Sequence, residues 1–246
     1  EMAAITEDGI EKLVKDREED WHELYVGRMD ADYDWYTLKA YEPKEAGDQA
    51  YTSNKPRTMA DKYLQTINRS NLNFTLYWGD DPAKKEQTSK IEQFLRGAIY
   101  AADLRLIAQL HPRLLGSFAW YACIRGGWLI ARALINKHGS GQKKGQTYFD
   151  IIPCDPRNTF FDTCAEGLLW VVRRRVASRQ AIEREYRVEL NTPDKLVTVL
   201  DWWDSEANGV LIKGEGKFVK KPAEHDLKHI PFCVIPIGSQ PLVSAG

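Results

Sequence analysis

The spacing of hydrophobic residues changes once along the chain, near Gly126-Gly127, and this change limits most strongly what the chain can fold into. Before the two glycines, apolar residues recur every three or four positions, the spacing of helices that bury one face. After them, apolar residues come in short, partly alternating runs that are typical of strands. The sequence therefore predicts an α+β fold, in which N-terminal amphipathic helices precede a mainly antiparallel β-sheet that carries one inserted short helix.

Four helices are expected before the change, each with a recognisable start or stop signal. The first helix is expected to run from a Thr6 cap to about residue 25, and the second to follow Pro56. The third is expected from Pro82 to Pro112, and the fourth over residues 114–124. Asp80-Asp81 provides the capping carboxylate for the third of these helices. The acidic and aromatic segment 29–51 is expected to form a loop with short extended pieces, and the alternating segment 71–78 a strand.

The second half is expected to be mostly strand. The strand-like runs cover residues 128–135, 148–152, 168–176, 196–203, 210–219 and 232–237. The glycine-rich segment 139–145 is expected to be a hairpin loop, Asn208-Gly209 separates two of the runs, and Ser178 is expected to cap the inserted helix. We accordingly divide the chain into a helical part, residues 1–127, and a β-rich part, residues 128–246.

The charges of the chain nearly cancel. Its 246 residues include 34 Lys and Arg against 35 Asp and Glu, a formal net charge of −1. A protein that holds nucleic acid through its phosphates normally carries a basic excess, so we expect no partner that is bound by bulk charge, although a local basic patch would be compatible with this balance. No apolar run reaches the roughly 18 to 20 residues that span a bilayer, and we expect no membrane contact.

Sequence patterns of common active sites are absent. The chain contains no G-x-S-x-G, G-x-x-x-x-G-K-[ST], H-E-x-x-H or G-x-G-x-x-G pattern. His225 and His229 are four residues apart and could share a metal on a helix, but Pro222 and Pro231 leave little room for one. We therefore expect no catalytic residues, no cofactor and no metal ligand.

The four cysteines show no C-x-x-C pair and no short spacing to histidine that would indicate a zinc site. They are Cys123, Cys154, Cys164 and Cys233. We expect them to be reduced and mostly buried, because a free cysteine packs as a small hydrophobic residue.

Arg173, Arg174 and Arg175 form the only compact basic run, and it falls in an expected strand. Alternate residues of a strand face opposite sides, so Arg174 should point away from its two neighbours. The run is a candidate for a solvated edge, a subunit-facing edge or a phosphate contact. Trp202 and Trp203 are interpreted as one buried and one interface-facing aromatic residue, because large aromatic residues are enriched where subunits pack.

Asp201 and Asp204 flank the two tryptophans and could form a carboxylate pair of the kind that glycosidases use, with the indoles stacking on a sugar. Both carboxylates lie at a strand end, and no separation between a general acid and a base can be identified. A hydrolase with an Asp/Trp cleft, acting on carbohydrate or nucleic acid, remains an alternative function.

Two turns are expected to be rigid scaffold features. In Asp155-Pro156-Arg157-Asn158, the proline fixes φ after a strand and the aspartate can accept hydrogen bonds from the following backbone N–H groups. In Arg125-Gly126-Gly127, the glycines end a helix and let the chain reverse tightly into the next strand.

The ordered set of these signals resembles the N-terminal half of the portal proteins of tailed bacteriophages and related gene-transfer particles. The resemblance runs from about Arg17 to Gly238, and the order of its motifs carries it. The motifs are Thr52-Ser53-Asn54-Lys55-Pro56-Arg57, Ile91-Glu92-x-Phe94, Ala102-Asp103, Ile124-Arg125-Gly126-Gly127, 150–158, Gly167-Leu168-Leu169-Trp170, Ser178 with Tyr186, Asp201-Trp202-Trp203, His229-Ile230-Pro231-Phe232 and Pro236-Ile237-Gly238.

The resemblance implies a structural subunit and no enzyme: a ring, usually a dodecamer, at one vertex of the capsid in the virion, assembled in the host cytoplasm. Such a ring is the conduit for double-stranded DNA during packaging and ejection. Its implied partners are other copies of itself, the major capsid protein, the packaging terminase motor and head–tail adaptor proteins. The chain would supply most of the wing region, with the stem, clip and crown missing from it. The near-zero charge suits a conduit, because strong phosphate contacts would hold sliding DNA in place.

Two other function classes remain open at the level of sequence. One is the hydrolase with an Asp/Trp cleft, and the other is a non-portal scaffold module that only binds protein. A ring with a central hole would favour the portal, and turnover of a substrate would favour the enzyme.

Overall fold

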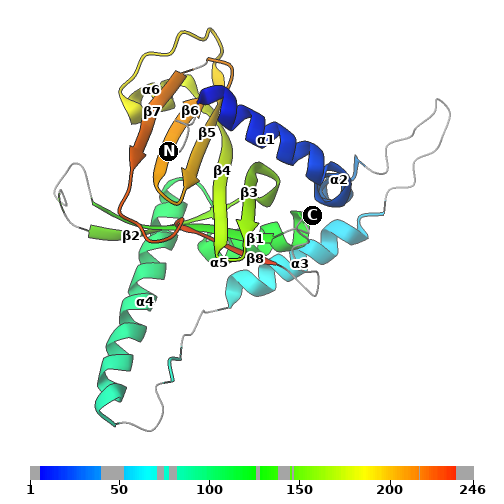
Figure 1. Cartoon of the computed structure of the whole chain (residues 1–246). Helices are drawn as coiled ribbons and strands as arrows, with labels where there is room; N and C mark the ends of the chain where they lie inside the picture. Colours follow the sequence, from blue (N-terminus) through cyan, green and yellow to red (C-terminus); the bar gives the residue numbers. More distant parts are fainter. Residues whose placement is uncertain are drawn as a thin grey trace. The chain divides into compact units, whose positions relative to one another are not determined.

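The computed structural model describes residues 6–39, 53–70, 75–77, 82–125, 128–137, 145, 147–215 and 217–236. Its helices are α1 (Glu7–Trp21), α2 (Gly27–Thr37), α3 (Lys55–Arg69), α4 (Pro82–Ala108), α5 (Leu114–Trp120) and α6 (Arg179–Tyr186). Its strands are β1 (Trp128–Lys137), β2 (Thr147–Cys154), β3 (Thr159–Cys164), β4 (Gly167–Ser178), β5 (Leu196–Asp204), β6 (Ala207–Ile212), β7 (Lys217–Glu224) and β8 (Phe232–Pro236). Helices precede strands, and the short α6 is inserted among them, so the predicted α+β fold is confirmed (Figure 1).

Contacts within the chain divide it into two compact units. The first unit joins Glu1–Asp30, Cys154–Phe232 and Pro236–Gly246, and the second joins Ala31–Pro153 and Cys233–Ile235. The units interleave along the sequence and do not follow a single boundary after residue 127. The last strand explains part of this, because β8 pairs beside β1 although about a hundred residues separate the two in the chain.

The first unit is built on an antiparallel sheet of five consecutive strands, in the order β3-β4-β5-β6-β7. Because side chains alternate along each strand, the sheet has two distinct faces. One face carries Val197, Val199, Val210 and Ile212, which pack with Ile182 of α6 and with Leu190. The other face carries Phe160 and Arg174, which contact side chains of α1. The sheet is therefore covered by a helix on each face.

Helix α1 forms as its sequence predicts. The Thr6 hydroxyl accepts a hydrogen bond from the Gly9 amide at 3.2 Å, which caps the first turn. Ile10, Val14 and Trp21 are buried along one side of the helix. The chain then continues through a π-helical segment, His22–Val26, directly into α2.

The second unit contains a three-stranded sheet in the order β2-β1-β8 together with α3, α4 and α5. The C-terminal part of α4 is fixed to its neighbours: Asp103 Oδ1 accepts a hydrogen bond from the Leu114 amide at 2.8 Å, and the Arg105 guanidinium donates to the Phe149 carbonyl. Figure 1 shows the rest of α4 running away from the strands of its own unit.

The expected loop over residues 29–51 is wrong in its first part, because residues 29–37 belong to α2. Residues 40–51 lie outside the described part of the chain. Met29 is buried, and Tyr33 and Tyr36 follow it at helical spacing. Tyr36 donates a hydrogen bond to Asp61 of α3 at 3.0 Å and packs edge-on against Trp120. These contacts explain why a segment so rich in aromatic and acidic residues is helical.

The strand predictions need four corrections. β3 was not expected, and Asn208-Gly209 lies inside β6 instead of separating strands. The expected single run over residues 210–219 is two strands, with a turn that includes Gly214 at φ +84°. Of the strand expected over residues 71–78, the described residues 75–77 are not in a strand. The expected loop over residues 139–145 lies outside the described residues, apart from Gly145.

The cysteines are only partly as expected. All four are free of disulfide bonds, but Cys154 is the one that is buried, whereas Cys123, Cys164 and Cys233 are exposed. The expectation that they are mostly buried is therefore wrong.

Candidate functional site

A network of ion pairs on the first unit is the most highly organised polar site in the described part of the chain. Glu18 of α1 accepts a hydrogen bond from Arg157 Nη1 at 2.9 Å. It also accepts two hydrogen bonds from Arg174, from Nη1 at 2.9 Å and from Nη2 at 3.2 Å. Arg157 Nε donates to both oxygens of Asp30 at 3.1 and 3.3 Å. One carboxylate thus joins α1 to β4 and to the turn before β3.

The Asp155-Pro156-Arg157-Asn158 turn positions this network. Asp155 Oδ1 accepts from the Arg157 amide at 3.0 Å, and its Oδ2 accepts from the Asn158 side chain at 3.0 Å. Asn158 Oδ1 in turn accepts from Arg174 Nε at 3.1 Å. The turn is a 3₁₀ segment with proline at its start, and its arginine and asparagine both reach the network.

The charges of the network set the protonation state of Glu18. Burial alone would raise the pKa of its carboxyl group, but the hydrogen bonds and positive charges of Arg174 and Arg157 outweigh burial and lower the pKa from 4.5 to about 2. Glu18 is therefore ionised throughout the neutral range. A carboxylate held in this state acts as a fixed structural anion and is poorly suited to donate a proton.

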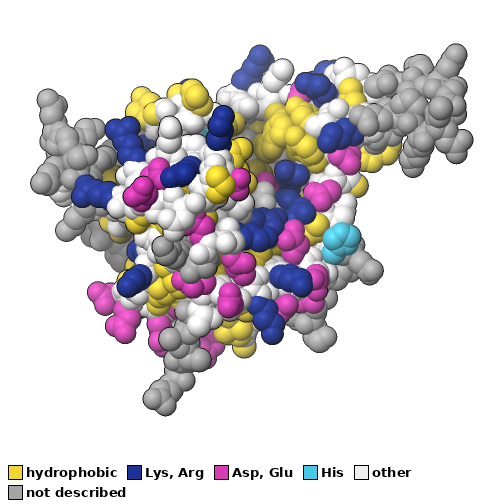
Figure 2. Space-filling model, turned by 90° about the horizontal axis from the view of Figure 1, so that it is seen from above, with side chains coloured by type: hydrophobic (Ala, Val, Ile, Leu, Met, Phe, Trp, Pro, Cys, Tyr) yellow, Lys and Arg dark blue, Asp and Glu magenta, His cyan; other side chains and the backbone are white. Residues whose placement is uncertain are grey.

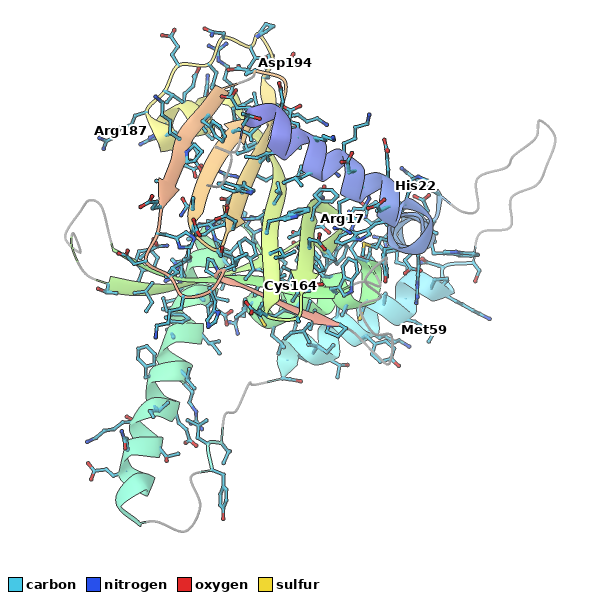
Figure 3. The ribbon with its side chains drawn as sticks, in the orientation of Figure 1. Arg17, His22, Met59, Cys164, Arg187 and Asp194 are labelled. Carbon is cyan, nitrogen blue, oxygen red and sulfur yellow. The ribbon has the colours of Figure 1, made fainter. Side chains whose placement is uncertain are left out.

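Further side chains of α1 attach to the same sheet. Arg17 Nη2 lies 2.8 Å from Asp162 Oδ2 of β3, and its guanidinium lies 5.8 Å from the Trp170 ring of β4. Figure 3 shows Arg17 directed from α1 toward these strands. Near the start of the helix, Glu7 accepts from the Phe218 amide at 3.2 Å and Glu11 from the Gly214 amide at 3.0 Å. The helix is thus tied to the sheet along its whole length.

The arginine run alternates as predicted. Arg174 faces α1, whereas Arg175 faces α6, where its Nη2 donates to both oxygens of Glu185 at 2.9 Å. Arg173 lies opposite Asp201 in the register of β4 and β5. Two of the three guanidinium groups are therefore engaged within the chain by carboxylates. These internal pairs do not favour a phosphate contact for the run.

Trp202 and Trp203 lie on opposite faces of β5, and both are buried, with 2% and 6% of their surface exposed. Trp203 Nε1 donates to Asp201 Oδ1 at 2.9 Å, and its ring packs against His225 and Phe232. The expectation that one of the two faces a neighbouring subunit is therefore corrected, because neither indole is accessible on the surface of the described chain.

Asp201 and Asp204 each accept structural hydrogen bonds, which two catalytic carboxylates would not be expected to do. Asp201 holds the Trp203 indole, and Asp204 Oδ1 accepts from the Glu206 and Ala207 amides at 2.7 and 2.6 Å in the β5–β6 turn. An odd and an even position of one strand face opposite sides of the sheet. The two carboxylates therefore do not line a common cleft.

The second predicted turn is described only in part. Gly126 and Gly127 lie outside the described residues, and Arg125 ends the π-helical segment Tyr121–Arg125. The Arg125 guanidinium lies 4.5 Å from the centre of the Tyr33 ring of α2, a cation–π contact. Arg125 therefore holds α2 within the second unit, a role that the sequence pattern did not indicate.

The visible face of the molecule in Figure 2 carries basic and acidic side chains intermixed, and neither charge covers it. Among the described residues, no group of three or more His, Cys, Asp or Glu side chains is placed to hold a metal ion. None of the helices in this part of the chain is long and apolar enough to cross a membrane.

Sequence reasoning identified Arg157 and Arg174 but not their partners. Glu18 was one of several charged residues on an amphipathic helix, and Asp30 was placed in an expected loop. Glu18 and Arg157 are 139 positions apart in the sequence, so no local pattern could have joined them.

No protein-family model matches the chain, and no curated protein sequence matches it.

Proposed function

We propose that this chain is a structural subunit of a phage-type portal, a ring at one capsid vertex through which double-stranded DNA enters and leaves. The observation that carries the proposal is the ordered succession of motifs from about Arg17 to Gly238. In this proposal the chain forms most of the wing region, and the energy for DNA movement comes from a separate packaging motor.

The contacts of the motif residues support a scaffold role. Arg157 and Asn158 of one motif reach Glu18 and Arg174, and Asp201-Trp202-Trp203 of another lies in the buried part of β5. Residues of a scaffold are expected to hold elements in place, whereas residues of an active site are expected to converge on a cavity. The motif residues named above hold elements of the fold in place.

The ring is the testable consequence. The polypeptide encoded by the complete reading frame that contains this chain should be purified and imaged by negative-stain electron microscopy. We expect rings with a central hole and many copies per particle. Compact monomers or dimers with no hole, at concentrations up to tens of micromolar, would contradict the proposal.

A hydrolase is not favoured by any contact described above, because Asp201 and Asp204 point to opposite faces and are both used in structural hydrogen bonds. A control assay keeps the two functions distinct. Release of reducing sugar or cleavage of nucleic acid by the pure protein would support the enzyme and argue against a purely structural role.

A further inference from the structure

Helix α3 packs on its own unit with one side only. Asp61 accepts a hydrogen bond from Tyr36 of α2 at 3.0 Å, and the Arg57 guanidinium lies 5.6 Å from the centre of the Tyr36 ring. Farther along the helix, Asn68 lies so close to Gly116 of α5 that a Cβ added to this glycine would collide with the Asn68 amide. These α3 residues are four and seven positions apart, so they mark one inner side of the helix.

The outer side of α3 carries three cations in a line. Lys55, Lys62 and Arg69 are seven residues apart, which is close to two helical turns, so they follow one another along the helix at intervals of about 10.5 Å. All three are exposed, and we call them the α3 basic row. None of the three is paired with a carboxylate of another described residue.

No negative charge of α3 opposes the basic row. Asp61 is the one acidic residue of this helix, and it lies on the inner side, 3.9 Å from the Arg57 guanidinium. The outer side therefore has three positive charges and no negative one, in a chain whose net charge is −1. Met59 and Tyr63 lie between the cations along the helix, and each is 60% exposed. The patch is a local excess of positive charge beside an exposed aromatic ring.

An even row of cations suits a partner that repeats a negative charge at regular intervals. The phosphate backbone of a nucleic acid has this property, and Lys and Arg side chains are its usual contacts. Tyr63 adds two compatible groups, because a tyrosine hydroxyl can donate to a phosphate oxygen and an aromatic ring can stack on an unpaired base.

Two other partners fit the patch less well. A helix that lies on an anionic bilayer buries a broad stripe of Trp, Phe or Leu, whereas the outer side of α3 offers Met59 and Tyr63 as its large apolar side chains. An acidic protein would have to carry carboxylates at the spacing of the row, whereas any stretch of a regular polyanion provides them. The charge pattern therefore favours nucleic acid.

We propose that the α3 basic row binds the phosphate backbone of a nucleic acid, with Lys55, Lys62 and Arg69 each contacting a phosphate and Tyr63 beside the strand. The inference rests on the charges of α3 and not on the proposed function. The row can bind nucleic acid whether or not the chain builds a ring, and the ring can form without it. Imaging of rings needs no nucleic acid, so the failure of one proposal is distinguishable from the failure of the other.

Fluorescence anisotropy of a labelled oligonucleotide of about 20 nucleotides, as a duplex and as a single strand, tests the proposal on the purified protein. We expect a dissociation constant of about 1–100 µM at physiological salt, the range of sequence-independent binding. The logarithm of the binding constant should fall with the logarithm of the salt concentration. Three neutralised phosphates predict a slope of about −2.7 for the duplex, at about −0.9 each, and about −2.1 for the single strand, at about −0.7 each. The probe that binds more tightly identifies the source of the phosphates.

Replacing all three residues of the row with Gln should remove most of the binding and flatten the salt dependence. Glutamine is a good helix former, so circular dichroism should show unchanged helix content. Lys62→Gln alone should make the duplex slope shallower by about 0.9, because one phosphate contact is lost. The matched control is the triple variant Lys12→Gln, Lys15→Gln and Lys90→Gln, which removes the same charge from exposed positions of α1 and α4 and should keep the binding.

Three outcomes would overturn the proposal. The first is no binding of either probe by about 100 µM protein at about 50 mM salt, where three phosphate contacts should be strong enough to detect. The second is an equal loss of binding in the row variant and in the matched control, which would assign the binding to bulk charge. The third is displacement of the probe by poly-L-glutamate as effectively as by unlabelled oligonucleotide of equal charge, which would make an acidic protein the partner.

Discussion

Arg174 and Glu18 lie 156 positions apart in the sequence and form a two-point hydrogen-bonded ion pair, Nη1 to Oε2 at 2.9 Å and Nη2 to Oε1 at 3.2 Å. The pair joins the first helix of the chain to the second strand of the five-stranded sheet. Arg157 binds the same carboxylate from the turn before β3. Three segments that are distant in sequence therefore depend on one glutamate.

Replacing Glu18 with Gln should destabilise the first unit. The substitution keeps the size of the side chain but leaves the partly buried Arg174 guanidinium without its anion, while Arg157 keeps its pair with Asp30. Removing one partner of a buried pair costs about 3–5 kcal/mol, and because this pair is partly exposed we expect a loss of about 2 kcal/mol in the free energy of unfolding. Urea denaturation at pH 7, followed by near-ultraviolet circular dichroism, measures it.

Glu19→Gln is the matched control for this experiment. The Glu19 side chain is 69% exposed, and it lies 3.8 Å from Lys15 in a surface pair. Surface pairs contribute about 0–1 kcal/mol, so this variant should stay close to wild type. Equal losses for the two variants would show that the network adds nothing beyond helix electrostatics.

The same residue predicts a pH dependence. Because the pKa of Glu18 is about 2 in the folded chain and 4.5 in the unfolded one, the ionised carboxylate stabilises the fold at and above pH 5. That contribution is lost as pH falls from about 5 to about 2. The difference in unfolding free energy between wild type and Glu18→Gln should therefore shrink across this range. A difference that stays constant down to pH 2 would mean that Glu18 is not the group responsible.

Replacing Trp203 with Phe should destabilise the isolated chain. The change removes the hydrogen bond to Asp201 and leaves unfilled volume beside His225 and Phe232. We expect a cost of about 2 kcal/mol from the two effects together. If Trp203 lay in a subunit interface instead, the stability of the monomer would hardly change and only assembly would suffer.

Trp35→Phe provides the comparison. Trp35 is 47% exposed on α2, so truncating it should cost clearly less than truncating Trp203. Chemical denaturation of the two variants side by side gives the ranking. A larger loss for Trp35 would contradict the burial described for β5.

Ser178 should contribute as a helix cap. Its hydroxyl accepts a hydrogen bond from the Ala181 amide at 3.3 Å at the start of α6. Ser178→Ala should lower the free energy of unfolding by about 1 kcal/mol. Ser178→Asp should keep most of the stability that the cap contributes, since aspartate also caps helices. Thermal or urea unfolding of both variants tests this, and equal losses would exclude capping as the cause.

Local signals predicted much of the fold. Thr6, Pro82 and Ser178 each begin a helix as expected, and the Asp155-Pro156 turn forms as expected. Each of these signals acts within three or four residues, so the chain carries it regardless of tertiary context.

The predictions that were wrong failed because contacts between distant parts of the chain overrode local signals. Asn208-Gly209 is a common turn signal, yet these residues pair with Trp203 and Trp202 of β5, and Asn208 is buried. Strand pairing along a buried sheet outweighed the local preference. The candidate site shows the same limit: an arginine run could be found in the sequence, but the carboxylates that bind Arg174 and Arg175 come from two different helices.

The proposal that this chain belongs to a ring at a single capsid vertex is tested most directly in assembled particles. Particles should be purified from cells that carry a peptide-tagged version of the complete reading frame, decorated with gold-labelled antibody and imaged. We predict one labelled vertex per particle, together with a copy number near that of a single ring by quantitative mass spectrometry. Intact, DNA-filled particles that carry no label, or label spread over the whole shell, would contradict the account.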